Sequence, residues 1–410
     1  MATPSDFAPT EIFNPAGDTT VPLNPQRLKI EFTGSSSEYF RIWIVNLLLT
    51  LVTLSLYLPF ARARRMRYFQ SNTLVDGHPL GFHGDPKRMF RGYLIVLLMG
   101  IAYSAVGQLY PRLNWVALTV FAIVWPVLWR ASLRFRLRNT SWRGVRLAFE
   151  GDVRSAYATM LPFFLPALVF LFALPQDPDA YNDQGEAVRS LGVMGLVFFS
   201  FLVISPWLWA RLKRYQQGGY SFAQERTELT ATTGQFYVLL GKAVLLSMAL
   251  SFAAVVVAGI VVVMVAGATV ATEALKGHVG PESVSMIVGL AIVSFGFMFY
   301  VVLPLTMGTY VTARMQNLVW ANTRSARVAF DSELTFKRLF KVTAVNWLLM
   351  IVTLGLFWPA TRIRLAKAKL EAMSIEVEGN VDHWIARAGS DEGGAIGDAA
   401  GDFFDFDIGF

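Results

Sequence analysis

NLLLTLVTLSLYLPFARAR, from Asn46 to Arg64, returns 300 positions later as NWLLMIVTLGLFWPATRIR, from Asn346 to Arg364. The two segments align without a gap and share ten of nineteen residues. Each begins in an apolar stretch, passes through a Thr-Leu-x-Leu-aromatic motif and ends in a proline followed by spaced arginines. This repetition predicts that the chain builds the same local structure twice, once near each end.

The composition is typical of a membrane protein. Of the 410 residues, 54% are apolar and 16% are charged, whereas a soluble domain carries about 25% charged residues. The apolar content excludes a disordered chain. The absence of cysteine excludes a disulfide scaffold, thiol catalysis and cysteine-ligated zinc or iron–sulfur sites. We therefore expect a mainly α-helical, polytopic membrane protein.

A transmembrane helix needs about 20 apolar residues. Stretches of that kind predict six full spans, at residues 92–109, 114–131, 156–174, 190–210, 237–268 and 284–311. The repeated segments fall in two further apolar stretches, 39–60 and 339–360.

The basic residues predict the orientation in the membrane. The connections 109–114, 175–189 and 270–283 hold three basic and six acidic residues, and the other 33 basic residues lie elsewhere. Because cytoplasmic loops carry the excess of lysine and arginine, these three connections should face outward. We expect a bacterial inner-membrane protein with both termini in the cytoplasm.

Short alternating strands recur before the predicted membrane segments. Each strand ends in an apolar residue followed by small or polar residues that can cap a helix. The apolar residues that end the five strands are Phe32, Phe82, Phe149, Leu229 and Phe330. Asp76-Gly77 and Arg143-Gly144 are typical of hairpin turns. Because single hairpins are marginally stable, we expect short cytoplasmic β-hairpins that pack together.

The strand units on both sides of each repeated segment predict that the chain enters the membrane there and returns. Stretches 39–60 and 339–360 would then be re-entrant helical hairpins, broken at 53–57 and 353–357. Such breaks need shielding by protein or a cavity. The alternative is eight plain spans, with residues 1–38 and 361–410 outside.

The chain divides into three regions. Residues 1–25 are polar and proline-rich, without the pattern of a signal peptide, and predict a disordered tail. Residues 26–388 form the membrane domain. Residues 389–410 form an acidic tail ending in DFFDFDIGF. This tail is either a docking peptide for a protein partner or a mobile acidic end.

Three motifs resemble those of the YjgN-like bacterial inner-membrane proteins, a family defined by a domain of unknown function. These motifs are F-x-G-S-x-x-E-Y-F from Phe32 to Phe40, T-L-x-L-Y-x-P-F-A-R-x-R from Thr53 to Arg64, and N-T-x-x-D-G from Asn72 to Gly77. The resemblance implies an inner-membrane location. It implies no activity and supplies no catalytic residues.

Two groups of residues are candidates for function. Asn46, Thr50 and Thr53 share one helix face, and Asn346 and Thr353 repeat two of them. This face is either a polar lining for a substrate between the two hairpins or a set of interhelical hydrogen bonds near the breaks. The second group either contacts anionic lipid headgroups or only sets topology. It comprises Arg62, Arg64, Arg65, Arg67, Arg130, Arg134, Arg362 and Arg364.

No catalytic, phosphate-loop or dinucleotide motif is present, so we expect no enzyme activity, cofactor or metal. The predicted span centres are almost free of charges, which argues against a carboxylate-driven proton antiporter. Nucleic-acid binding is not expected, because the basic clusters lie directly next to apolar spans. Self-association remains open. Two function classes survive: a membrane-embedded scaffold that binds lipid or a partner, and a channel or carrier for a small or apolar solute.

Overall fold

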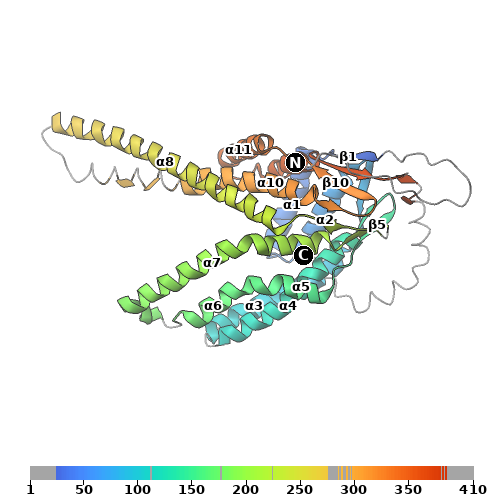
Figure 1. The fold of residues 1–410 in the computed structure, drawn as a ribbon, viewed down its shortest axis with the longest axis horizontal. Coiled ribbons are helices and arrows are strands. Elements are labelled where there is room, and N and C mark those ends of the chain that lie inside the picture. The colour runs from blue at the N-terminus through green and yellow to red at the C-terminus, as the bar shows by residue number, and fades with distance from the viewer. Residues whose placement is uncertain are drawn as a thin grey trace, which may run out of the picture.

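The computed structural model describes residues 25–110, 113–175, 178–223, 225–275 and 298–379. It also describes residues 285, 288–289, 292–293, 296, 381–382 and 384–385. Within this part of the chain the strands gather at one end of the molecule, and the long helices extend away from them (Figure 1).

The strands form one antiparallel sheet that closes on itself. Its order is β7-β6-β5-β4-β3-β2-β1-β11-β10-β9-β8. The two ends of this order, β7 (Glu225–Arg226) and β8 (Glu228–Leu229), are joined by Thr227 alone. The sheet is therefore barrel-like, and we call it the strand ring. The other strands are β1 (Gln26–Phe32), β2 (Thr73–Val75), β3 (His78–Phe82), β4 (Thr140–Trp142), β5 (Val145–Phe149), β6 (Tyr220–Phe222), β9 (Thr323–Arg324), β10 (Val328–Ser332) and β11 (Met373–Val377).

Left-handed turn residues explain two of the hairpins. Asp76 and Gly77 join β2 to β3 with φ of 51° and 76°, and Arg143 and Gly144 join β4 to β5 with φ of 51° and 88°. Positive φ at both central residues is the geometry of a type I′ turn, which suits the twist of two paired strands. Both predicted turns are confirmed.

Helices leave and re-enter the strand ring in pairs. Their bounds are α1 (Ser36–Val52), α2 (Leu58–Ser71), α3 (Pro86–Leu109), α4 (Asn114–Arg138), α5 (Val153–Met160), α6 (Leu165–Ala173), α7 (Gln184–Gln217), α8 (Thr233–Leu275), α10 (Thr309–Trp320), α11 (Phe336–Val352) and α12 (Trp358–Leu370). Helices joined by strands also pack together: α2 with α3, α4 with α5, α7 with α8, and α10 with α11. The last helix, α12, packs on the first, α1. The helices thus follow one another around the ring.

Side-chain caps start several of these helices. Ser35, Asp85 and Asp152 each accept a hydrogen bond from a backbone N–H in the first turn of α1, α3 and α5, as predicted. The fifth copy of the strand unit differs from its prediction. Strand β10 does not end at Phe330 but continues to Ser332, and Thr335 caps α11. The strand pairs with β11 through Ser332, so pairing extends it past the apolar residue.

Each repeated segment forms two antiparallel helices with a break where the sequence predicts one. Helix α1 ends at Val52 and α2 begins at Leu58, while α11 ends at Val352 and α12 begins at Trp358. Neither segment is one continuous helix over 39–60 or 339–360. Strands β1 and β2 flank the first pair and are hydrogen-bonded to each other, so the chain returns to the same sheet.

The two breaks have the same hydrogen bonds. Ser55 N–H donates to the Thr50 carbonyl at 2.8 Å, and Gly355 N–H donates to the Met350 carbonyl at the same distance. Ser55 and Gly355 have φ of 73° and 88°. This is the Schellman pattern of a helix C-terminus, which needs left-handed residues. Pro59 and Pro359 then open the second helix of each pair, where proline costs no hydrogen bond.

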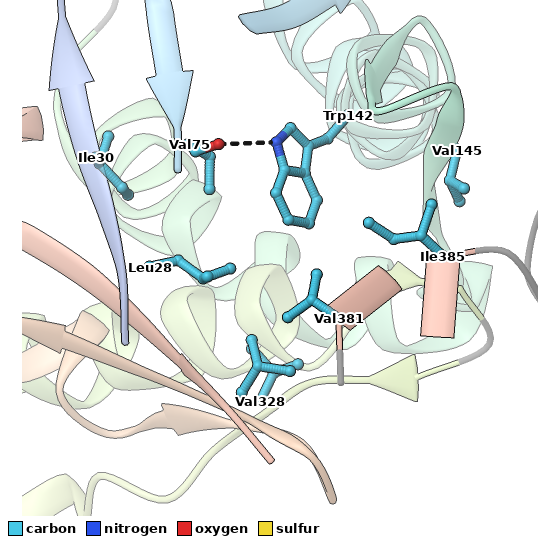
Figure 2. Close-up of a cluster of buried hydrophobic side chains, with 9 residues drawn as sticks. Leu28, Ile30, Val75, Trp142, Val145, Val328, Val381 and Ile385 are labelled. Carbon is cyan, nitrogen blue, oxygen red and sulfur yellow. Dashed lines mark hydrogen bonds between the residues drawn. The ribbon is translucent and has the colours of Figure 1, made fainter. Parts of the chain in front are cut away.

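Apolar side chains fill the interior of the strand ring (Figure 2). The Trp142 indole N–H donates to the Val75 carbonyl at 3.2 Å across this core. Val381 and Ile385 enter from the chain after β11 and are only 4% and 9% exposed. We call the described residues Val381, Asp382, Trp384 and Ile385 the plug segment. The buried members of the core are Leu28, Ile30, Val75, Trp142, Val145, Val328, Val377, Val381 and Ile385.

Five helical stretches in the described part of the chain are long and apolar enough to cross a membrane. They contain or overlap the first five predicted spans: Pro86–Leu109, Trp115–Arg138, Val153–Ala173, Gln184–Gln217 and Thr233–Val265. Part of the sixth, 284–311, lies outside the described residues, as do residues 389–410 and almost all of 1–25. The chain is a mostly helical, polytopic membrane protein.

Candidate functional site

The threonines of the two breaks are bound to backbone. The Thr53 hydroxyl donates to the Leu49 carbonyl at 2.7 Å and accepts from Tyr57 N–H at 3.0 Å. Thr353 makes the same two bonds, at 2.6 and 3.0 Å, 300 residues later. Each hydroxyl therefore joins the end of one helix to the start of the next. This geometry favours the hydrogen-bonding interpretation of these two residues over the substrate lining.

The two asparagines are buried but differ in their partners. Asn46 is 8% exposed, and its amide Nδ2 lies 3.5 Å from the Ala61 carbonyl of α2. Asn346 is fully buried, and neither atom of its amide has a hydrogen-bond partner among the described residues. An unpaired buried amide costs roughly 1–3 kcal/mol. Thr50 has no polar counterpart in the second copy, where Met350 replaces it.

The two helix pairs lie side by side. Helix α1 packs against both α2 and α12. The rings of Trp43 on α1 and Trp358 on α12 are 6.1 Å apart. The two helix pairs are therefore in contact through α1 and α12, while the Asn46 amide is directed to α2.

The candidate arginines occupy three helices, and we call the set the basic collar. Four lie on α2, two on α4 and two on α12. Three stack on aromatic rings at the start of their own helix: Arg64 on Tyr57, Arg364 on Phe357 and Arg362 on Trp358, with 5.1–5.8 Å between guanidinium and ring centre. Arg130 donates to the Gly151 carbonyl at 2.6 Å.

Part of the basic collar is crowded with positive charge. Burial, together with the charges of Arg136 and Arg65, lowers the pKa of Arg62 to about 10. Like charges brought together in this way favour binding of an anion, because an anion relieves their repulsion. Arg136 on α4 was not among the candidate residues. Only the approach of α4 to α2, which no local spacing reveals, brings it to Arg62.

A groove runs between α1 and α2. It has a volume of about 510 Å³ and is lined by Arg41, Ile42 and Val45 from α1 and by Arg64, Arg67, Tyr68 and Ser71 from α2. We call it the α1–α2 groove. It brings together two candidate arginines, Arg64 and Arg67, and a third, Arg41, that was not among the candidates. The predicted break at 53–57 could have identified Arg41, because antiparallel pairing of the two helices about this break places Arg41 opposite Arg64 and Arg67.

Other candidate chemistry is not brought together. His78 contacts the Asp76 carbonyl, and His83 contacts the Ser141 hydroxyl, so each ring has a partner within the strand ring. Among the described residues no group of three His, Cys, Asp or Glu side chains could hold a metal ion.

Comparison with known proteins gives the family. The family described as "Bacterial protein of unknown function (DUF898)" matches residues 27–403. "Inner membrane protein YjgN" of Salmonella typhimurium (strain LT2) is 24% identical over 86% of this chain and 88% of its own length. Proteins of the same name from Escherichia coli O157:H7 and K12 are 25% and 26% identical, each over 49% of this chain and 52% of their own length.

No solved structure is significantly similar to this chain. The names of the relatives and the five apolar helices agree with an inner-membrane location. Because the family match runs over most of the sequence, the chain belongs to the DUF898 family of bacterial proteins of unknown function.

Proposed function

We propose that this protein is a membrane-embedded scaffold that binds anionic lipid at its basic collar, rather than a conduit or an enzyme. The observation that carries the proposal is the filled strand ring, in which nine buried apolar side chains meet. A packed core of this kind favours a structural role for the ring, because a path for a polar solute would need water or polar groups along it.

The α1–α2 groove supports lipid as the ligand. Arg41, Arg64 and Arg67 supply positive charge, while Ile42 and Val45 supply an apolar wall. A phospholipid has the matching division between a charged headgroup and an apolar chain. Arginine also suits phosphate, since its planar group can donate two hydrogen bonds to it.

Lipid retention tests this proposal. The variant Arg64→Gln/Arg67→Gln should retain less phosphatidylglycerol than the parent protein when both are purified in mild detergent and weighed by native mass spectrometry. Arg324→Gln is the matched control, since Arg324 lies on β9 and pairs with Glu228. Equal retention by the groove variant and the control would refute lipid binding at the groove.

We also propose six full spans, two re-entrant hairpins and a cytoplasmic strand ring. Leu54 and Leu354 at the two breaks are 87% and 93% exposed apolar side chains, which supports a membrane around them. Backbone groups of each break are hydrogen-bonded within the break, as a break at membrane depth requires. The chain has no cysteine, so single substitutions report location. Ser325→Cys should react with a membrane-impermeant maleimide only after the inner membrane is opened, and Asp179→Cys before it. Leu354→Cys should react from neither side. Reaction of Leu354→Cys from the periplasm would favour plain spans.

The acidic tail 389–410 remains a proposed docking segment for a protein partner. Its charge is opposite to that of the basic collar, and its phenylalanines can pack on an apolar surface.

A channel or carrier is the second candidate, and the unpaired amide of Asn346 favours it. A fully buried polar group that has no partner among the described residues is costly unless a ligand or water meets it. The path would run between the two helix pairs and not through the strand ring. Solute flux into proteoliposomes that is lost in Asn346→Leu, while the protein stays folded, would support this candidate and contradict the scaffold.

A further inference from the structure

A second cavity lies between the start of α5, the end of α7 and strand β7. Its volume is about 360 Å³. Gly151, Asp152 and Ser155 line it from the start of α5, Arg211 and Arg214 from α7, and Arg226 from β7. We call it the arginine pocket. It shares no residue with the α1–α2 groove and does not depend on the scaffold proposal.

The arginine pocket carries uncompensated positive charge. None of its three arginines forms an ion pair with a carboxylate in the described part of the chain. Its one acidic residue, Asp152, caps α5 and accepts a hydrogen bond from Ser155 N–H at 2.9 Å. The bonds from Ser155 hold the pKa of Asp152 below its usual value, so it carries one negative charge against three positive charges.

The arginines are held in place before any ligand arrives. Arg214 donates to the Ala231 carbonyl at 3.1 Å and to the Thr233 hydroxyl at 2.8 Å. Arg226 donates to the Gly218 carbonyl at 2.6 Å. The guanidinium of Arg211 lies 4.7 Å from the centre of the Trp207 ring. Side chains that are already ordered lose less conformational entropy on binding, so this arrangement favours a ligand that meets all three.

From this geometry we propose that the arginine pocket binds a phosphate-bearing ligand. Guanidinium groups recognise phosphate through paired hydrogen bonds and keep their charge at every physiological pH. A net excess of positive charge selects an anion, and the hydroxyl of Ser155 at the wall can donate to a phosphate oxygen. The volume lies at the lower end of the range for small-molecule sites, so it exceeds the needs of a bare phosphate ion.

Two sources can present this chemistry: a lipid headgroup and a soluble phosphate compound. Helix α7 carries Arg211 and Arg214 near the end of an apolar helix long enough to cross the membrane, where headgroups lie. The pocket also borders β7 of the strand ring, on the side from which a soluble compound would arrive. The two sources are therefore separated by experiment.

The test uses the purified full chain and Arg211→Gln. Arg211 contacts Trp207 but forms no ion pair among the described residues, so its substitution should leave the fold intact. Binding of inorganic phosphate and of sn-glycerol 3-phosphate is measured by calorimetry. Retention of phosphatidylglycerol, against a phosphate-free glycolipid, is measured by native mass spectrometry. Arg324→Gln on β9, outside both the arginine pocket and the α1–α2 groove, is the control for general loss of charge.

We expect Arg211→Gln to weaken binding of the true ligand about tenfold or more, since a hydrogen bond to a charged group contributes that much. The affinity of Arg211→Lys should lie between those of the parent protein and Arg211→Gln, because lysine keeps the charge and loses the paired hydrogen bonds. An effect on glycerol 3-phosphate identifies a soluble ligand, and an effect on phosphatidylglycerol alone identifies a headgroup. Unchanged binding in Arg211→Gln and Arg226→Gln, or an equal loss in Arg324→Gln, would overturn the proposal.

Discussion

Val381→Asp should release the plug segment from the strand ring. Val381 is 4% exposed and lies in the apolar core. A buried carboxylate without a partner costs several kcal/mol in proteins. In the variant, releasing the segment forgoes the burial of Ile385, about 1.5–3 kcal/mol, and the edge-on contact of Trp384 with Phe222, about 0.5–1.5 kcal/mol. Release is then no more costly than burying the charge. It also spares the strand pairings, so we expect local opening and not unfolding of the ring.

Hydrogen exchange measured by mass spectrometry reports this release. In Val381→Asp the peptide covering residues 378–385 should exchange much faster, while peptides from β2 to β5 keep their protection. The control is the neighbouring residue, Asp382→Asn. Asp382 is exposed and pairs with Arg143 at 2.5 Å, an interaction worth at most about 1 kcal/mol at the surface. Unchanged exchange over 378–385 in Val381→Asp, or loss of protection throughout the ring, would refute this reasoning.

Three further predictions concern stability, each measured by thermal unfolding of the purified chain with circular dichroism. Gly355→Ala should destabilise the chain by about 1–2 kcal/mol, because φ at Gly355 is 88°. Ser55→Gly should stabilise it by about 0.5–1 kcal/mol, because φ at Ser55 is also positive. A stabilising Gly355→Ala or a destabilising Ser55→Gly would contradict this reasoning. Asn346→Leu should raise the melting temperature, since it removes a buried amide that has no partner in the described part of the chain, and a fall would mean that the amide has a partner. Trp142→Phe should cost about 1–3 kcal/mol by leaving the Val75 carbonyl without its donor, and an unchanged melting temperature would contradict this.

The helix breaks and the turns can be predicted from sequence because local residues determine them. Repetition of the Thr-Leu-x-Leu-aromatic motif locates both breaks, and Asp76-Gly77 announces a tight turn. A helix cap such as Asp85 before Pro86 is equally local. These features depend on backbone preferences that act within a few residues.

Closure of the strand ring cannot be predicted in this way. Strands β7 and β8 have two residues each, too few for an alternating pattern to appear. The pairing of β1 with β11 joins residues more than 340 positions apart. The arginine pocket likewise joins the end of α7 and β7 to the start of α5, which lies more than 50 residues earlier. Arg226 does not belong to a basic cluster in the sequence, so only the folded structure shows that it lines the arginine pocket.

The pairing of β1 with β11 also sets a condition on biogenesis. Strand β1 can find β11 only after residues 373–377 have been synthesised, and every described membrane helix is made before then. A ribosome-bound chain that stops earlier keeps an unpaired edge on β1, which can pair with another chain. Quality control at the membrane can therefore recognise an unfinished chain by one feature: its helices are inserted, but the edge of β1 that pairs with β11 is still unpaired.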